Sequence, residues 1–222
     1  IACDAYDIKR QNGSFILIDR ATNLTVGAGM IRHGLRRYEN VLWQSLAIGR
    51  EQRASLTEQK SFVLWMTGLS GSGKSTIANE VEQIFHRNGL RTYILDGDNV
   101  RQGLNADLGF SDSDRAENIR RVSEVAKLFV DAGVVTIVSF ISPFGEERRR
   151  ARDIVGTHDF FEVFVDAPLH VVEARDVKGL YAKARAGLIP NFTGINSPFE
   201  IPADPDLRID TSGASIEECV KM

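Results

Sequence analysis

The chain has 222 residues, of which 43% are hydrophobic and 26% are charged, and its formal net charge is −3. These totals describe an ordinary globular protein with one medium-sized domain and a smaller additional piece. They exclude a strongly basic surface that would attract nucleic acid or an anionic membrane, and no apolar run approaches the roughly 20 residues of a membrane helix.

The cysteines and the chain ends give two further expectations. Cys3 and Cys219 lie at opposite ends without the spacing of a metal site, which favours a reducing, cytoplasmic setting. The chain begins at Ile1 rather than Met and ends within a helical pattern at Met222. We therefore expect a piece of a longer polypeptide, truncated in its last helix.

Residues 1–31 differ in pattern from the rest. Strands are predicted at 14–19 and 25–31, with turn signals at 20–24. Two strands alone are marginal in water, so we expect them to belong to a larger sheet. The runs Phe-Ile-Leu-Ile-Asp at 15–19 and Thr-Val-Gly-Ala-Gly-Met-Ile at 25–31 resemble the last strands of the C-terminal β-barrel of translation-factor-like GTPases, closest to the GTPase subunit of sulfate adenylyltransferase. An unrelated hairpin extension is the alternative.

Residues 32–60 are predicted to form a partly helical linker. The segment is charged, and Leu42, Trp43, Leu46 and Ile48 give it a patchy apolar face. We expect it to dock on the next domain through Trp43. No chemistry is predicted for it, because a run of this kind is usually a solvated face.

From residue 61 onward, strand-type runs alternate with helical patterns. This alternation predicts an α/β domain at 61–222, with a parallel sheet of the P-loop NTPase type sandwiched by helices. The run at 134–141 is the most apolar and is expected to be central. Strands are predicted at 62–66, 91–95, 134–141, 160–166 and 207–210, and helices at 75–88, 114–132, 145–156, 168–176 and from 215.

The motif Gly-Leu-Ser-Gly-Ser-Gly-Lys-Ser at 68–75 matches the phosphate-binding loop and lies between a predicted strand and a predicted helix. Glycines let backbone N–H groups close around phosphate oxygens, and the helix N-terminus adds donors and positive charge. Lys74 would reach the β- and γ-phosphates, and the Ser75 hydroxyl would hold Mg²⁺. A chance glycine-rich turn is the alternative. The predicted ATP-binding residues here are Gly68, Ser70, Gly71, Ser72, Gly73, Lys74, Ser75 and Thr76.

Asp96 and Asp98 follow the strand at 91–95 and form a second candidate group. Ligands bind at the carboxyl ends of such strands. A usual Walker B strand would end in Asp, whereas the run at 134–141 is followed by Ser142. The acid for Mg²⁺ or for the nucleophile must come from elsewhere, and Asp96 is the nearest in layout. The alternative is a simple turn that caps the next helix.

Basic residues at helical spacing form a third candidate group. Arg115, Asn118 and Arg121 lie one turn apart and suit an anionic ligand, because guanidinium groups pair with phosphate-like oxygens. A solvated basic face is the alternative. A further basic group comprises Lys178, Lys183 and Arg185, in a segment expected to act as a lid.

Several motifs together resemble the adenylyl-sulfate kinase family over about residues 40–222. They are Asp-Gly-Asp-Asn-Val-Arg at 96–101, Leu-Asn-Ala-Asp-Leu-Gly-Phe-Ser at 104–111, Arg-Ala-Glu-Asn-Ile-Arg-Arg at 115–121, Phe-Ile-Ser-Pro-Phe at 140–144, Lys-Gly-Leu-Tyr at 178–181 and Asn-Phe-Thr-Gly-Ile at 191–195. With the N-terminal strands, the chain is similar to a bifunctional sulfate adenylyltransferase subunit fused to this kinase.

The resemblance implies transfer of the γ-phosphoryl of ATP to the 3′-hydroxyl of adenylyl sulfate. Phe110 would stack on adenine opposite Phe192, Asp96 would position Mg²⁺ or accept the hydroxyl proton, and Arg175 would bind ATP. Lys74, Asp96 and Ser142 are the implied catalytic residues, and Ser75 and Asp96 the metal ligands. The implied adenylyl sulfate contacts are Asp98, Asn99, Arg101, Phe110, Arg115, Asn118, Ile141, Ser142, Lys178, Phe192, Thr193 and Gly194.

The sequence departs from the family's usual motifs at two positions, and other functions remain as alternatives. Gly145 stands where the family usually has Arg, and Val177 where it usually has Pro. Ser142 resembles a residue described as a phosphoserine, but no base for it is visible, so we predict direct transfer. Another small-molecule kinase and a regulatory nucleotide-binding module are the alternative functions. The resemblance also implies a homodimer and association with the GTPase domain and its small subunit, with no nucleic acid or membrane partner.

Overall fold

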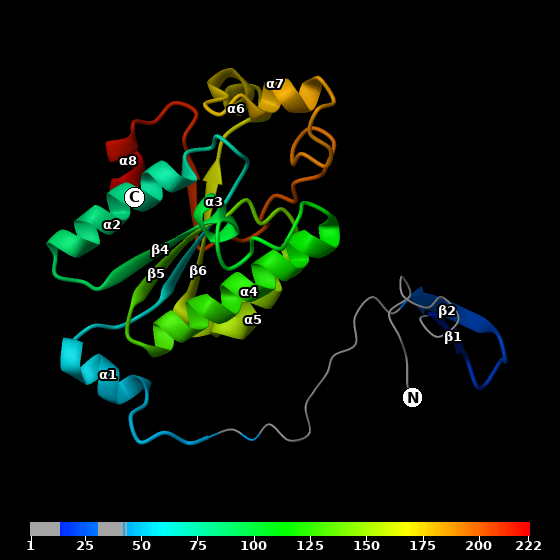
Figure 1. The fold of residues 1–222 in the computed structure, drawn as a ribbon, viewed down its shortest axis with the longest axis horizontal. Coiled ribbons are helices and arrows are strands. Elements are labelled where there is room, and N and C mark those ends of the chain that lie inside the picture. Colours follow the sequence, from blue (N-terminus) through cyan, green and yellow to red (C-terminus); the bar gives the residue numbers. More distant parts are fainter. Residues whose placement is uncertain (1–13, 31–41, 43) are drawn as a thin grey trace. The chain divides into compact units, whose positions relative to one another are not determined.

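The computed structural model describes residues 14–30, 42 and 44–222, and the chain divides into two units between residues 46 and 47 (Figure 1). Trp43, through which the linker was predicted to dock, lies outside the described residues. So do Cys3 and residue 31, the end of the second predicted strand. Within the described part, no helix combines the length and the hydropathy that crossing a membrane requires.

The first unit contains the predicted hairpin. Strands β1 (Ser14–Ile18) and β2 (Thr25–Met30) pair antiparallel, with Ser14 opposite Met30. The turn closes because Asp19 accepts hydrogen bonds from Asn23 N at 2.8 Å and, through its side chain, from Ala21 N at 2.8 Å. The apolar side chains of β1 are about half exposed.

The second unit is built on a five-stranded parallel sheet in the order β4-β5-β3-β6-β7 (Figure 1). Its strands are β3 (Val63–Thr67), β4 (Thr92–Asp96), β5 (Val135–Ser139), β6 (Phe160–Asp166) and β7 (Leu207–Asp210). The apolar run at 134–141 was expected to be central, but β3 holds the middle position. β5 is fully buried because it lies between two strands and under helices on both faces.

Helices cover both faces of the sheet and create two cores. α4 (Asp112–Asp131) and α5 (Gly145–Val155) cover one face, around Trp65, which stacks between Phe140 and Phe160. α2 (Lys74–Arg87) and α8 (Ile216–Lys221) cover the other face, around Met66 and Ile77. α4 begins two residues before the predicted start because the Ser111 hydroxyl caps it, accepting from Asp114 N at 3.2 Å.

The second unit also contains three short helices that come after strands β4 and β6. α3 (Gly97–Arg101) follows β4 directly, α6 (Leu169–Arg175) follows β6, and α7 (Leu180–Arg185) begins the segment 176–200, which we call the lid. Neither α3 nor α7 was predicted as a helix, since each has only five or six residues and little apolar periodicity. The lid packs on α6 through its own small core, which contains Tyr181 and Phe192.

α1 (Arg50–Thr57) lies within the segment predicted as a linker. Arg50 forms an ion pair with Asp159 and donates to Ser61 O over 2.9 Å, and Arg53 donates to Asp131 O over 3.0 Å. Two arginines therefore hold α1 against the rest of the second unit. α1 lies at the end of the sheet opposite the phosphate-binding loop (Figure 1).

Candidate active site

The phosphate-binding loop joins β3 to α2 at the carboxyl edge of the sheet. Gly68 adopts a positive φ of 150°, and a Cβ there would lie 2.3 Å from Val165 O, so no other residue fits. Gly73 has a φ of 101° and caps α2, whose first residue is Lys74. The loop thus presents the amide end of a 14-residue helix to the cavity, which favours a bound anion.

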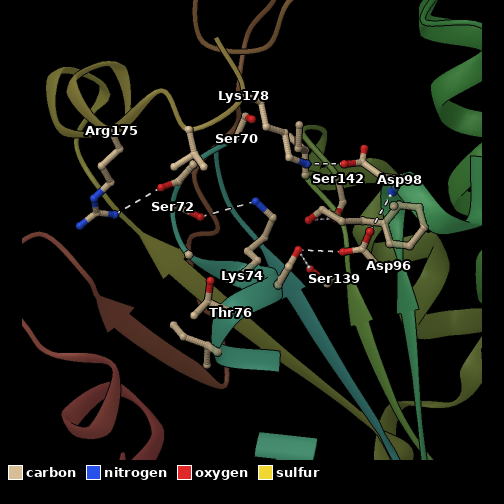
Figure 2. Close-up of a pocket in the computed structure, with 18 of the residues that line it drawn as sticks. Ser70, Ser72, Lys74, Thr76, Asp96, Asp98, Ser139, Ser142, Arg175 and Lys178 are labelled. Carbon is tan, nitrogen blue, oxygen red and sulfur yellow. Dashed lines mark hydrogen bonds and ion pairs between the residues drawn. The ribbon is translucent and has the colours of Figure 1, made fainter. Parts of the chain in front are cut away.

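Lys74 is buried beneath this loop (Figure 2). Its ammonium group donates to the carbonyl oxygens of Gly68 over 2.9 Å and Leu69 over 2.7 Å. Burial lowers the pKa of Lys74 to about 7, with the nearby Lys178 adding to the effect and Asp96 opposing it. A polyanion in the loop would supply the negative charge that favours the protonated form of this amine.

Ser75, Asp96 and Ser139 bring three oxygens together. Figure 2 shows Asp96 and Ser139 beside Lys74. Ser75 Oγ donates to Asp96 Oδ2 over 2.7 Å and lies 3.2 Å from Ser139 Oγ. The other oxygen of Asp96 caps α3, accepting from Asp98 N at 3.0 Å. The turn-and-cap alternative for Asp96 is therefore part of its role, while Oδ2 remains directed at Ser75. Ser139 occupies the strand end where the sequence lacked an acid.

The end of the cavity at the phosphate-binding loop is completed by contacts that sequence reasoning only partly identified. Arg175 donates to Thr211 O and, over 3.3 Å, to Gly71 O. Thr211 Oγ1 donates to Ser72 O over 2.9 Å, and Tyr181 Oη donates to Ser70 O over 2.8 Å. Thr211 follows the last strand, so the rule that ligands bind at carboxyl strand ends was a signal for it.

The opposite end of the same cavity is formed by the segment after α3 and the start of α4. Phe110 is 60% exposed, and the Arg101 and Arg115 guanidinium carbons lie 4.5 and 6.0 Å from its ring centroid. Arg101 donates to Gly109 O over 2.9 Å, which holds it beside the ring. An exposed aromatic face between two cations suits a planar, anionic molecule such as a nucleotide.

The predicted basic stripe on α4 is only partly at the cavity. Arg115 and Asn118 line it, but Arg121 does not. Arg121 instead pairs with Asp107 over 2.7 Å and with Glu117 over 2.9 Å. Lys178 also reaches the cavity, from the lid, and pairs with Asp98 (Figure 2).

Ser142 is buried at 2% exposure and has a left-handed backbone, with a φ of 39°. Its hydroxyl accepts from Trp65 Nε1 over 3.0 Å and donates to Phe140 O over 3.4 Å. Its carbonyl accepts from Arg148 Nη1 over 2.8 Å. The neighbouring Gly145, one of the two departures from the family, donates its N–H to Glu200 Oε2 over 2.7 Å.

Five predicted residues do not line the cavity: Gly68, Asn99, Phe192, Thr193 and Gly194. Phe192 is 9% exposed and packs edge-on against Tyr181, so it does not face Phe110 across the cavity in this structure. Thr193 accepts from Arg115 over 3.1 Å. The predicted residues that do line it are Ser70, Gly71, Ser72, Gly73, Lys74, Ser75, Thr76, Asp96, Asp98, Arg101, Phe110, Arg115, Asn118, Ile141, Ser142, Arg175 and Lys178.

A phosphate-binding loop on a parallel sheet, opposite a second, cationic half-site, defines a P-loop phosphotransferase domain. A family model described as adenylylsulphate kinase matches residues 60–210, and this match, with the relatives below, places the chain in the adenylylsulphate kinase family.

Two curated relatives and one solved structure are similar to this chain and support its assignment to the family. The chain is 58% identical over 220 residues to the bifunctional enzyme NodQ of Rhizobium sp. (strain N33), covering 99% of this chain and 34% of NodQ. It is 55% identical to the adenylyl-sulfate kinase of Marinobacter nauticus, covering 82% of this chain and 91% of that one. The Mycobacterium tuberculosis APS kinase CysC, in complex with AMPPNP and APS, aligns with a TM-score of 0.71 and 53% identity over 73% of this chain and 95% of that one. The chain spans about a third of the length of NodQ.

Proposed function

We propose that residues 47–222 transfer the γ-phosphoryl of ATP to the 3′-hydroxyl of adenylyl sulfate, giving 3′-phosphoadenylyl sulfate and ADP, as a step of sulfate assimilation. One observation carries this proposal: a single cavity joins the phosphate-binding loop to an exposed phenylalanine flanked by arginines. A donor nucleotide fits the first half, and an anionic acceptor nucleotide fits the second.

The donor half binds the triphosphate. Backbone amides of residues 70–76 enclose the β- and γ-phosphates, and Lys74 exchanges its loop carbonyl partners for phosphate oxygens. Arg175 contacts the loop and lies beside the nucleotide. Charge that develops on the transferring group is stabilised by Lys74 and the loop amides.

Magnesium fits the oxygen cluster beside Lys74. Ser75 Oγ and Asp96 Oδ2 lie 2.7 Å apart, and Mg²⁺ prefers one or two such protein oxygens together with substrate phosphates. Residues 14–30, 42 and 44–222 contain no group of three or more His, Cys, Asp or Glu side chains that would hold a metal by themselves. When bound with ATP, Mg²⁺ neutralises charge on the phosphates.

The acceptor half orients adenylyl sulfate. Phe110 stacks on the adenine of adenylyl sulfate. The anionic groups of adenylyl sulfate are faced by Arg101, Arg115, Asn118 and Lys178. The 3′-oxygen forms a bond to the γ-phosphorus as the bond from that phosphorus to the bridging oxygen of ADP breaks. The hydroxyl proton passes to the Asp96 carboxylate if that group acts as the base, or to water if Asp96 holds Mg²⁺. Contacts from Phe192, Thr193 and Gly194 require the lid to move toward the acceptor. Arg115 already contacts the lid through Thr193. Asn99 belongs to α3, and its contact requires a change in that helix.

Ser142 acts as a contact on the acceptor side and not as a phosphorylated intermediate. Its hydroxyl is hydrogen-bonded between Trp65 and Phe140, and no side-chain base contacts it among the described residues. Direct transfer from ATP to the acceptor needs no such intermediate.

Residues 1–31 belong, in this proposal, to the last strands of a GTPase barrel, with 32–60 as the linker. The support is the exposed apolar hairpin and the alignment of the chain with the bifunctional NodQ. The longer protein would associate with the small subunit of sulfate adenylyltransferase, act as a homodimer and work in the cytoplasm.

Coupled measurement of ADP release with and without adenylyl sulfate tests the proposed reaction. We expect release that depends on adenylyl sulfate and saturates with it. Tight ATP binding without acceptor-dependent ADP release would favour the regulatory module. Release stimulated only by another alcohol would favour a different small-molecule kinase. Lys74→Ala provides the matched inactive control.

A further inference from the structure

The side-chain amide of Asn118 has one of its two ends held by the protein. Asn105 Nδ2 donates to Asn118 Oδ1 over 2.8 Å, and the two side chains are 0% and 4% exposed. Among the hydrogen bonds of the described residues, none engages the Asn118 NH₂ group. Asn118 lines the cavity beside Arg115. Because its oxygen is turned toward Asn105, Asn118 has both N–H donors of its amide available for a ligand.

Asn105 is fixed in place by the turn that carries it. Its backbone N–H donates to Val100 O over 3.0 Å, and its carbonyl accepts from Leu108 N over 3.1 Å. Arg121 holds the same turn against α4, donating to Leu104 O over 3.2 Å and pairing with Asp107. These contacts fix the backbone of Asn105, and its side chain is fully buried against Asn118.

The hydrogen bonds of the Asn105 side chain show which of its two polar atoms contacts Asn118. Asn105 Oδ1 is buried and has no hydrogen-bond partner among the described residues. A buried amide oxygen without a partner destabilises a fold, and a leucine of similar volume would avoid this penalty. The contribution of Asn105 is thus its NH₂ donor, directed at Asn118.

We propose that Asn105 is a positioning residue, which locks the Asn118 amide with its donors toward the acceptor and so selects an anionic group at that point. This inference rests on the proposed function, in which Arg115 and Asn118 face the anionic phosphosulfate of adenylyl sulfate. A donor pair from Asn118, one helical turn from the Arg115 guanidinium, extends the anion site.

Asn105→Asp tests the orientation, because a carboxylate of the same shape only accepts. The Asn118 amide would then turn its NH₂ toward position 105 and its oxygen toward the acceptor. Asn105→Leu removes the donor without adding charge, and it keeps the test decidable if the Asp variant does not fold. Each is made in the wild-type and the Asn118→Ala full-length chain, and KM is measured for both substrates.

We expect N105D to raise the KM for adenylyl sulfate roughly ten- to hundred-fold, the range of a hydrogen bond to a charged group, and N105L to raise it less. The KM for ATP should change less than about threefold in both. In the Asn118→Ala background each substitution should add less than about twofold, since Asn105 acts through Asn118.

Either of two results would overturn the inference: a KM for adenylyl sulfate within twofold of wild type in N105L, or an equal rise with and without Asn118. A wild-type chain without adenylyl-sulfate-dependent turnover would instead overturn the proposed function, and the inference with it.

Discussion

The indole nitrogen of Trp65 donates a hydrogen bond to the Ser142 hydroxyl over 3.0 Å in the protein interior. The two residues lie 77 positions apart, on β3 and after β5, which pair in the sheet. The hydroxyl that resembles a phosphorylation site is thus part of the core of the fold. This contact makes the chemical role of Ser142 testable.

Ser142→Ala should keep measurable turnover, with kcat reduced less than about tenfold and a raised KM for adenylyl sulfate. It should also lower the free energy of unfolding by about 1–3 kcal/mol, because the buried Trp65 N–H loses its acceptor. Steady-state kinetics and urea unfolding measure the two effects. Isolation of a kinetically competent phosphoserine at 142 would show that transfer proceeds through the enzyme.

Arg148 should be essential for stability. It is 4% exposed, pairs with Glu162 over 2.7 Å and donates to the carbonyls of Ser142 and Glu200. Arg148→Met leaves the buried Glu162 with only its longer contact to Arg152, at 3.8 Å, so the free energy of unfolding should fall by about 3–5 kcal/mol.

The matched control is Arg149→Met, one position along α5, whose side chain is 66% exposed. This control should change the free energy of unfolding by less than about 0.5 kcal/mol. Equal effects of the two substitutions in urea unfolding would contradict a structural role for the buried ion pair.

Glu147 should make stability depend on pH. Burial raises the pKa of its carboxyl to about 7, with Asp112 and Glu200 adding to the shift and Arg115 and Arg148 opposing it. The folded state therefore binds more protons than the unfolded state between about pH 4.5 and 7. The contribution of Glu147 consequently becomes less favourable as the pH rises through this window.

Glu147→Gln removes this titration. Its free energy of unfolding should exceed that of wild type by about 1–3 kcal/mol at pH 8 and by much less at pH 5. Urea unfolding at the two pH values measures the difference, with Glu146→Gln, an exposed neighbour, as the control. A Gln variant less stable than wild type at pH 8 would refute the sign of this prediction.

Arg115→Ala and Asn118→Ala should weaken adenylyl sulfate far more than ATP. Both line the acceptor half of the cavity, and Arg115 also holds the lid through Asn191 O and Thr193 Oγ1. We expect a roughly ten- to hundred-fold higher KM for adenylyl sulfate. Arg120→Ala, on the same helix but outside the cavity, should leave the KM for adenylyl sulfate unchanged. Equal losses for ATP would place the two residues at the wrong half-site.

Local sequence predicted the parts of the site that are built by short-range interactions. The loop at 68–75 depends on backbone geometry within a few residues, so its motif specifies it. The cap formed by Asp96 is equally local, but it was considered only as the alternative role of that residue. The helix predicted at 114–132 was found at Asp112–Asp131 for the same reason, because its cap and periodicity are local.

Long-range packing decided what the sequence did not predict. The middle position of β3 depends on pairings with residues more than 70 positions away. The burial of Phe192 against Tyr181 and of Ser142 against Trp65 also arises only once distant elements meet. Ser139 was missed because the strand was predicted to run to residue 141, which placed Ser139 inside it, whereas β5 ends at Ser139.

Transfer of label from [γ-³²P]ATP to adenylyl sulfate tests the central claim most directly. The account predicts that the label appears on the 3′-oxygen of the acceptor, that one ADP forms per labelled product, and that Lys74→Ala loses this transfer while keeping its thermal unfolding transition. Near-normal transfer by Lys74→Ala, or label that never reaches the 3′-position in the wild type, would contradict it.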